Sequence, residues 1–534
     1  MYDPTGLTIL VLFGVVILAL SILARRTGTN APVLLILGGV ALALVPTIAR
    51  LQVPPELVVL IFLPALLYWE SLTTSLRKIR RDLRSLVLSS VFLVLATAAA
   101  VAAAAHYALG MDWAVAFVLG AIVAPTDATA VTAVARDLPR RQLTMLRAES
   151  LVNDGTALVV FSVALGVATG QEEFRVLGAL GDFAISYLGG IAVGALVAWL
   201  AVLARRIAAD PMLVTVVSVL TPFVAFLLAE EIHASGVLAV VVCGLGIARV
   251  GPRITSARAR VLVHSFWQVT TFLLNAALFV LVGMQLPRAI STVSSRSVAA
   301  AVGGALLVAV VVVATRFVWF FTVPYVIRTL DRRPAQRARR IGARGRLPLA
   351  WSGFRGAVSL AIALAVPLTT TAGTPFPERD LLIVLALGVI LVTLVGQGLT
   401  LPAVIRFGRF GPDTAFDDEV LLARRRTLDA ALVALPRLAA ERAVPEALAR
   451  RVRAEQEHRL HILDPAHGTL DDDLDDAAED AAMERDLRVA LLDERRRVLL
   501  ALRDESVIDD AVVLRVQAEL DNEELGLRGA PGPE

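Results

Sequence analysis

Long apolar runs alternate with short polar connections over the first three quarters of the chain. Most runs approach the ~20 residues that an α-helix needs to cross the hydrocarbon core of a bilayer. The pattern predicts thirteen spans, at residues 7–24, 31–48, 57–76, 85–106, 113–135, 143–169, 180–204, 211–229, 234–249, 262–285, 297–327, 349–370 and 380–405. The fold class predicted is therefore an all-α membrane protein of about 13 transmembrane helices.

The charges in the connections alternate with the predicted spans. Connections after the odd-numbered spans carry 25 Arg and Lys residues when Arg147 and Arg249 at the adjoining span ends are included, whereas those after the even-numbered spans carry 5. Cytoplasmic loops of membrane proteins are enriched in Arg and Lys. This asymmetry supports the span count and predicts an N-terminus outside and a C-terminus in the cytoplasm.

Two of the predicted spans are interrupted. The fifth contains Ala124-Pro125-Thr126, and the twelfth begins with a Gly-rich turn around Arg355 and ends near Pro367. They lie seven spans apart and therefore run in opposite directions. Interrupted helices at corresponding positions of two inverted halves point to a transporter binding site. We expect spans one to six and eight to thirteen to form two inverted repeats with crossed broken helices.

Composition divides the chain near residue 406. Of all residues 57% are hydrophobic, and the mean hydropathy is +0.72, as in polytopic membrane proteins. Residues 1–406 hold 33 basic and 18 acidic side chains, a net charge of +15, whereas residues 407–534 hold 18 and 30, a net charge of −12. We predict a transmembrane domain at 1–406 and a charged, mostly helical cytoplasmic tail at 407–534.

The tail has two features that suggest a role. Leu487 and Leu491 belong to an apolar stripe of near-heptad spacing, and residues 471–476 form an acidic cluster. The cluster could attract ions or belong to a regulatory domain. A solvated loop or helix start explains it as well.

Polar residues gather in the fifth and sixth predicted spans. Thr126 and Asp127 follow Pro125, and Ser150 and Asp154 share one face of the sixth span. Ionisable groups at membrane depth are costly and usually mark an ion or proton pathway. We predict a cation and proton site for Na⁺ formed by the carboxylates of Asp154 and Asp127, the Thr126 and Ser150 hydroxyls, and backbone carbonyls freed by the break. Asn153 neighbours this set.

Such a site can also carry a proton. Burial and a second nearby carboxylate both favour the protonated form of a carboxyl group, whereas a bound cation favours the charged form. Proton and cation then compete for one site, which antiport requires.

Arg316 and Arg355 lie inside predicted spans, away from the connections counted above. Arg355 cannot lose its proton usefully and needs a partner, for which Glu149 is the candidate. The predicted Glu149–Arg355 ion pair would hold the broken helices against the sixth span. Snorkelling of Arg355 to the interface is the alternative, and snorkelling is the preferred interpretation for Arg316. Glu70 could line an entrance or belong to a packed helix end.

Signals of enzymes are missing from the sequence. It contains no P-loop and no HExxH motif, and Cys243 is its only cysteine. We expect a transporter that is not an enzyme and needs no cofactor.

Four stretches resemble the signatures of a known family. They are GAIVAPTDATAV, AESLVNDGTALVVF, FLPALLYWE and WSGFRGAVSLAIAL. They look like those of bacterial sodium/proton antiporters of the monovalent cation:proton antiporter-1 family, over about residues 7–405. The resemblance implies homodimers of thirteen-span protomers with an elevator-like core.

The resemblance also implies roles for single residues. Asn153 and Asp154 match the ion-binding motif, Thr126, Asp127 and Ser150 match further cation ligands, and Glu149 and Arg355 match a stabilising pair. The function expected is exchange of Na⁺ for H⁺ across the plasma membrane for pH and sodium homeostasis, with electroneutral stoichiometry. Exchange of Li⁺ or K⁺ by the same fold is an alternative, and a cation channel or a transport-inactive membrane sensor is a more distant one.

Overall fold

The computed structural model describes most of the chain. The residues outside the description are 1–4, 28, 30, 46–57, 75, 129, 132–134, 136–137, 171–175, 209, 293–297, 331–341, 411–414, 463–477 and 529–534. Within the described ranges the regular structure is helical, apart from one isolated β-bridge between Thr369 and Pro375. The predicted all-α class is confirmed.

Helices occupy every predicted span. They are α1 (Thr5–Thr27), α2 (Ala31–Ala43), η1 (Val58–Phe62), α5 (Leu63–Thr73), α6 (Leu76–Leu109), α7 (Trp113–Val123), α9 (Arg140–Ala168), α10 (Val176–Ile207), α11 (Pro211–Glu231), α12 (Gly236–Ile254), α13 (Ala257–Thr292), α14 (Val298–Leu330), α16 (Ala343–Trp351), α17 (Ala357–Leu364), α18 (Arg379–Leu391), η2 (Val392–Gln397) and α19 (Gly398–Gly408). Among the described residues, eight helices are long and apolar enough to cross a membrane. The number thirteen stays a prediction.

Local sequence explains where several of these helices begin. The side chain of Asp210 accepts a hydrogen bond from the Met212 N–H at 2.8 Å, and Pro211 follows at the first helical position of α11. Ser235 caps α12 by accepting from the Leu238 N–H at 3.2 Å. These caps satisfy backbone donors that the first helical turn leaves free.

The buried apolar side chains form two large cores. The larger core centres on α2, α5 and α10 to α13. The second core is built from α6, α7, α9, α14, α17 and α18. Glycines allow close helix contacts in both: a methyl group on Gly283 would overlap the backbone of α2 at Ile36, and one on Gly120 would overlap α6 at Ala98. Small residues at helix contacts are common in membranes, where van der Waals packing drives association.

Both predicted helix breaks are present. The helix α7 ends at Val123, and residues 124–127 are not helical. In the twelfth predicted span, α16 ends at Trp351 and α17 begins at Ala357, with non-helical residues 352–356 between them. The two breaks meet inside the protein, as described below.

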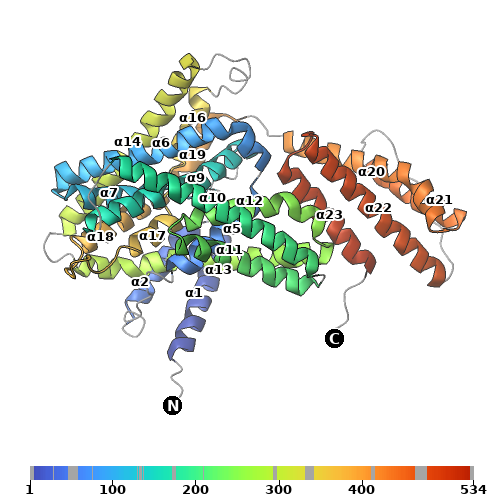
Figure 1. Cartoon of the computed structure of the whole chain (residues 1–534), viewed down its shortest axis with the longest axis horizontal. Coiled ribbons are helices and arrows are strands. Elements are labelled where there is room, and N and C mark those ends of the chain that lie inside the picture. Colours follow the sequence, from blue (N-terminus) through green and yellow to red (C-terminus); the bar gives the residue numbers. More distant parts are fainter. Residues whose placement is uncertain are drawn as a thin grey trace.

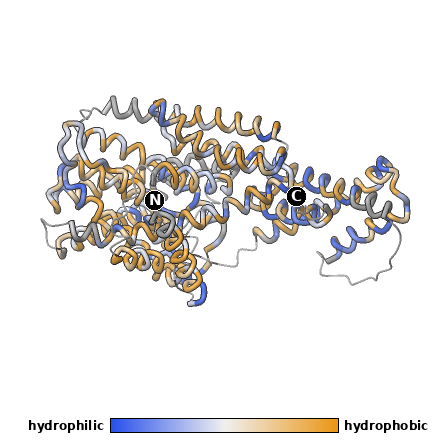
Figure 2. The backbone as a smooth tube through the Cα atoms, turned by 90° about the horizontal axis from the view of Figure 1, so that it is seen from below, coloured by the Kyte–Doolittle hydropathy of each residue, from blue (hydrophilic) through white to orange (hydrophobic). Residues whose placement is uncertain are grey.

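The C-terminal region forms four helices on the right of Figure 1. These are α20 (Ala415–Glu441), α21 (Glu446–Ile462), α22 (Ala478–Asp504) and α23 (Asp510–Arg528). They have two small apolar cores of their own, one of which contains Leu487 and Leu491. Blue, hydrophilic stretches are frequent along them in Figure 2. The acidic run 471–476 lies outside the described residues.

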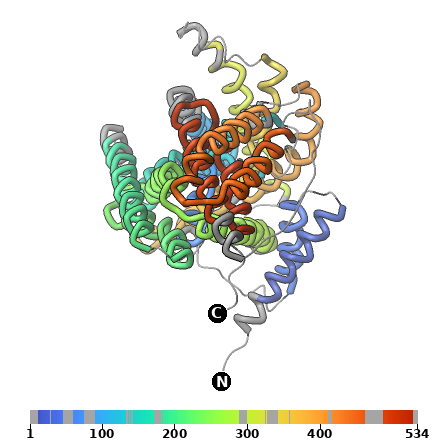
Figure 3. Tube along the Cα trace, turned by 90° about the vertical axis from the view of Figure 1, so that its right-hand side faces the viewer, coloured from blue at the N-terminus to red at the C-terminus, as the bar shows by residue number. Residues whose placement is uncertain are grey.

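The tail bundle rests against one end of the membrane unit. Figure 3 shows its orange and red helices in front of that end. Helix α23 packs on α13, and Arg260 of α13 is paired with Asp521 of α23. Arg249 and Arg253 of α12 both pair with Asp504, at the end of α22.

Candidate functional site

The two helix breaks lie in contact with each other. The Asp127 N–H donates to the carbonyl of Phe354 at 2.8 Å. The Arg355 guanidinium, which is 1% exposed, donates through Nη1 to the carbonyls of Ala124 at 2.5 Å and Pro125 at 2.8 Å. A buried guanidinium therefore satisfies carbonyls that the break releases.

Helix α9 holds the first break from its other side. The Ser150 hydroxyl donates to the Thr126 carbonyl at 2.8 Å. With its amide nitrogen donating to the Glu149 and Ser90 carbonyls, Asn153 accepts from the Thr126 hydroxyl at 3.2 Å. This orientation satisfies both ends of the amide. Asn153 is 1% exposed and lies outside the lining of the cavity described next, so it positions Thr126.

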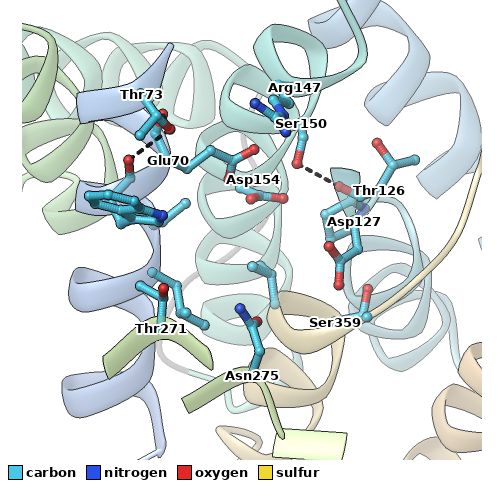
Figure 4. A pocket seen from close by; sticks show the side chains of 16 residues that line it. Glu70, Thr73, Thr126, Asp127, Arg147, Ser150, Asp154, Thr271, Asn275 and Ser359 are labelled. Carbon is cyan, nitrogen blue, oxygen red and sulfur yellow. Dashed lines mark hydrogen bonds between the residues drawn. The ribbon is translucent and has the colours of Figure 1, made fainter. Parts of the chain in front are cut away.

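A cavity of about 270 Å³ opens beside these residues. Residues of α5 and α13 line this cavity together with the first break, α9 and the start of α17. Figure 4 shows Glu70 of α5 extending toward Asp154 of α9, with Asp127 on the far side. The polar side chains that line the cavity are Glu70, Thr73, Thr126, Asp127, Arg147, Ser150, Asp154, Thr271, Asn275 and Ser359.

Three buried oxygens of this lining have no protein partner among the described residues. They are Oε1 of Glu70, Oδ1 of Asp154 and Oγ of Ser359. Asp154 is 2% exposed. Buried polar atoms are normally hydrogen-bonded, and oxygens are the preferred ligands of hard cations. The cavity is thus suited to a small cation or to protons and water.

Asp127 is held more firmly than Asp154. Its Oδ1 accepts from the Ala130 N–H at 3.1 Å. Gly356 lies so close that a methyl group there would overlap the Asp127 carboxylate. The two carboxylates that the sequence assigned to one site therefore line the same cavity in different environments.

Comparison with known proteins decides the family. The model of the transmembrane sodium/hydrogen exchanger family matches residues 12–407. The chain belongs to the sodium/hydrogen exchanger family. It is accordingly a multi-pass membrane transporter and not an enzyme.

Relatives in this family match the chain over different shares of its length. An uncharacterized Na⁺/H⁺ exchanger of Mycobacterium tuberculosis is 45% identical over 529 residues, 98% of this chain and 96% of that protein. A sodium, potassium, lithium and rubidium/H⁺ antiporter of Bacillus subtilis is 32% identical over 413 residues, 73% of this chain and 61% of that protein. The mycobacterial match extends through the tail.

A solved structure shares the exchanger fold. The sodium proton antiporter MjNhaP1 of Methanocaldococcus jannaschii superposes with a TM-score of 0.58 and 19% identity. The match covers 76% of this chain and 98% of that one.

One predicted contact of this exchanger-family site is wrong. Glu149 pairs with Arg316, whose Nη1 lies 2.6 Å from Oε1, and not with Arg355. Arg316 also donates to the Leu349 carbonyl and is 1% exposed, so it does not snorkel. The pair joins α9 to α14 and α16, while Arg355 bonds to backbone carbonyls instead.

Other lining residues were not assigned to the site from the sequence. The sequence is compatible with two positions for Glu70, an entrance or a packed helix end, and it indicates for Arg147 only a basic charge near a cytoplasmic connection. Nothing in the sequence assigns Thr271, Asn275 or Ser359 to the site. Only Glu70 had a sequence signal, a carboxylate at the end of an apolar run.

Proposed function

We propose that this exchanger-family protein exchanges Na⁺ for H⁺, one for one, across the plasma membrane. One observation carries the proposal. A cavity brings buried carboxylate oxygens of Asp154 and Glu70, which lack hydrogen-bond partners among the described residues, next to Asp127 and the two helix breaks.

The exchange follows from competition for Asp154. A desolvated carboxyl group favours its neutral form, so an empty site takes up a proton. A cation that enters the cavity receives ligand oxygens from Asp154, Asp127 and the Ser150 and Thr126 hydroxyls, and it favours the charged carboxylate. Binding of the cation then releases the proton, and the reverse occurs on the other side of the membrane.

Arg355 and Asn153 serve as supports in this scheme. Arg355 holds the unwound carbonyls of Ala124 and Pro125, and Asn153 orients the Thr126 hydroxyl. Residues whose positions are fixed in this way lower the cost of assembling the ligands when the cation binds.

Two features of the arrangement are also proposed here. The N-terminus lies outside and the C-terminal tail in the cytoplasm, which places Arg147 and the start of α9 at the cytoplasmic end of the cavity. The protein works as a homodimer of elevator-type protomers, which is the assembly implied by the family resemblance.

The test is proton flux in proteoliposomes loaded with Na⁺, Li⁺ or K⁺. We expect Na⁺-dependent proton movement in the wild type and none in Asp154→Asn, since an amide neither carries the proton nor supplies a charged ligand. Asp112→Asn is the matched control, because Asp112 is an exposed residue before α7. Normal exchange by Asp154→Asn would refute the assignment, and flux driven by K⁺ alone would identify the protein as a K⁺/H⁺ exchanger.

A further inference from the structure

The peptide group between Phe354 and Arg355 is hydrogen-bonded at both of its ends. Its carbonyl, on Phe354, accepts from the Asp127 N–H at 2.8 Å. Its N–H, on Arg355, donates to the Thr393 hydroxyl oxygen at 3.2 Å. Because a peptide group is planar, its C=O and N–H point in opposite directions and turn together. The bond to Thr393 on one side therefore sets the direction in which the carbonyl meets Asp127 on the other.

Thr393 is itself fixed by the helix that carries it. It is fully buried, and its hydroxyl donates to the carbonyls of Val389 at 2.9 Å and Ile390 at 3.1 Å. These two acceptors share the one hydroxyl hydrogen, so an oxygen lone pair remains for the Arg355 N–H. The bonds form one chain from α18 through Thr393 and the peptide group to Asp127, and hydrogen bonds in such a chain strengthen one another.

The helix is irregular where Thr393 lies. Helix α18 passes into α19 through the π-helical segment η2, of which Thr393 is the second residue. Single π-turns inside α-helices are rare and frequently occur at functional sites. This one stands where the thirteenth predicted span contacts the second helix break.

The N–H that Thr393 receives has no second acceptor among the described residues. Arg355 lies in the non-helical stretch 352–356, so no helical turn satisfies its backbone. A buried N–H without an acceptor is rare because it is costly. If the hydroxyl were lost, we expect the peptide group to turn away from its present direction.

Such a turn would reach the first break by two routes. The Phe354 carbonyl would move relative to the Asp127 N–H, and the Arg355 guanidinium would move relative to the carbonyls of Ala124 and Pro125, to which it donates. Thr393 does not line the cavity, so its influence on the ion can only be indirect.

We propose that Thr393 is a positioning residue of the cation site. Its hydroxyl orients the peptide group between Phe354 and Arg355 and, through that group, the backbone of Asp127. The inference rests on the proposed function and adds to it a residue of the thirteenth predicted span that touches neither ion.

Loss of the hydroxyl should weaken Na⁺ binding more than it slows transport. Thr393→Val keeps the size of the side chain and removes the acceptor, so more binding free energy is spent on ordering the ligands. We expect a tenfold or greater rise in the Na⁺ concentration for half-maximal exchange, with a maximal rate within about twofold of the wild type. Thr393→Ser keeps the hydroxyl and should retain the wild-type Na⁺ dependence.

The experiment measures proton flux in proteoliposomes over a Na⁺ titration. Thr393→Ala is included because it places no group against the Arg355 N–H, and it should raise the half-maximal Na⁺ concentration as Thr393→Val does. Thr221→Val is the matched control. Thr221 is 4% exposed, and its hydroxyl donates to the Val217 carbonyl of its own helix α11 at 2.5 Å, so exchange by this variant should equal that of the wild type.

Three results would overturn the positioning role. They are a wild-type Na⁺ dependence in both Thr393→Val and Thr393→Ala, a Thr393→Ser variant as impaired as Thr393→Val, and a loss of maximal rate without a change in the half-maximal Na⁺ concentration. Absence of cation-dependent proton flux in the wild type would refute the exchange function and this role with it, whereas the three results refute the role alone.

Discussion

At the scale of single residues, the choice of partner for Glu149 decides how the site is held together. The sequence offers two arginines at membrane depth, Arg316 and Arg355, and both could reach a carboxylate. Glu149 and Arg316 are 167 positions apart in the chain, so their contact depends on how α9 and α14 are placed. Hydropathy predicts where the spans lie in the sequence, but not how each helix is rotated about its axis relative to its neighbours. For this reason the sequence could not show that Glu149 faces Arg316 and not Arg355.

The corrected pair leads to a stability prediction. Arg316→Ala leaves Glu149 charged and unpaired in the interior, which should cost about 3–5 kcal/mol in the free energy of unfolding. Arg355→Ala leaves two carbonyls without this donor and should cost less, about 1–3 kcal/mol. Thermal unfolding in detergent measures both.

A double-mutant cycle provides the control for this pair. Glu149→Ala/Arg316→Ala removes both charges and should be more stable than Arg316→Ala alone. Additive losses from the two single changes would show that the two side chains do not depend on each other.

At the scale of helices, the two breaks and their crossing were predictable from the sequence, whereas the hydrogen bonds that join them were not. Pro125 and the Gly-rich turn around Arg355 mark where the helices α7 and α16 end, since proline and glycine both weaken a helix. The hydrogen bond from Asp127 to the Phe354 carbonyl is a tertiary contact without a local signal. The contact between the breaks agrees with the predicted crossing, while the inverted repeat itself stays a prediction.

The crossing point leaves no room for a side chain at Gly356. In Gly356→Ala the new methyl group would overlap the Asp127 side chain from its carboxylate back to its Cβ, so the ligand and the backbone that carries it must both shift. We expect a tenfold or greater rise in the Na⁺ concentration for half-maximal exchange, on the order of 1.4 kcal/mol or more of lost binding. Dye-monitored proton flux over a Na⁺ titration checks this.

Gly303→Ala serves as the control for this change. Nothing lies within 4 Å of a methyl group added at Gly303 on α14. The Na⁺ dependence of exchange by the Gly303→Ala variant should therefore equal that of the wild type. Unchanged Na⁺ dependence in Gly356→Ala would mean that Asp127 is not a ligand.

At the scale of the whole molecule, the charge asymmetry predicts a boundary between the membrane unit and the tail near residue 406. The apolar stripe around Leu487 and Leu491 indicated a helix there, and both side chains are buried in the tail bundle. The docking of the bundle could not be read from the sequence. Asp521 and its partner Arg260 are 261 positions apart, and isolated charges on helical faces usually remain in solvent.

Docking of the tail depends on Asp521. Its carboxylate is 3% exposed and accepts from Arg260 of α13 and, at 2.8 Å, from Arg496 of α22. After Asp521→Ala, Arg496 still has Asp493 and Glu524 as partners, whereas Arg260 keeps, among the residues that the structure describes, only the Thr255 carbonyl. Asp521→Ala should therefore weaken the contact between the membrane unit and the tail more than it destabilises the tail bundle itself.

We expect Asp521→Ala to loosen this contact by about 3–5 kcal/mol, the usual cost of breaking a buried ion pair. Hydrogen exchange should then quicken in the first turns of α13 and along α23, while the amides of α7 and α9 keep their wild-type protection. Glu519→Ala is the control on the same helix, because Glu519 pairs within the tail with Arg424 and Arg515 at an exposed site. Such surface pairs contribute about 0–1 kcal/mol, so its exchange pattern should match the wild type. Equal protection of α13 and α23 in Asp521→Ala and Glu519→Ala would mean that apolar packing, and not this ion pair, holds the tail against the membrane unit.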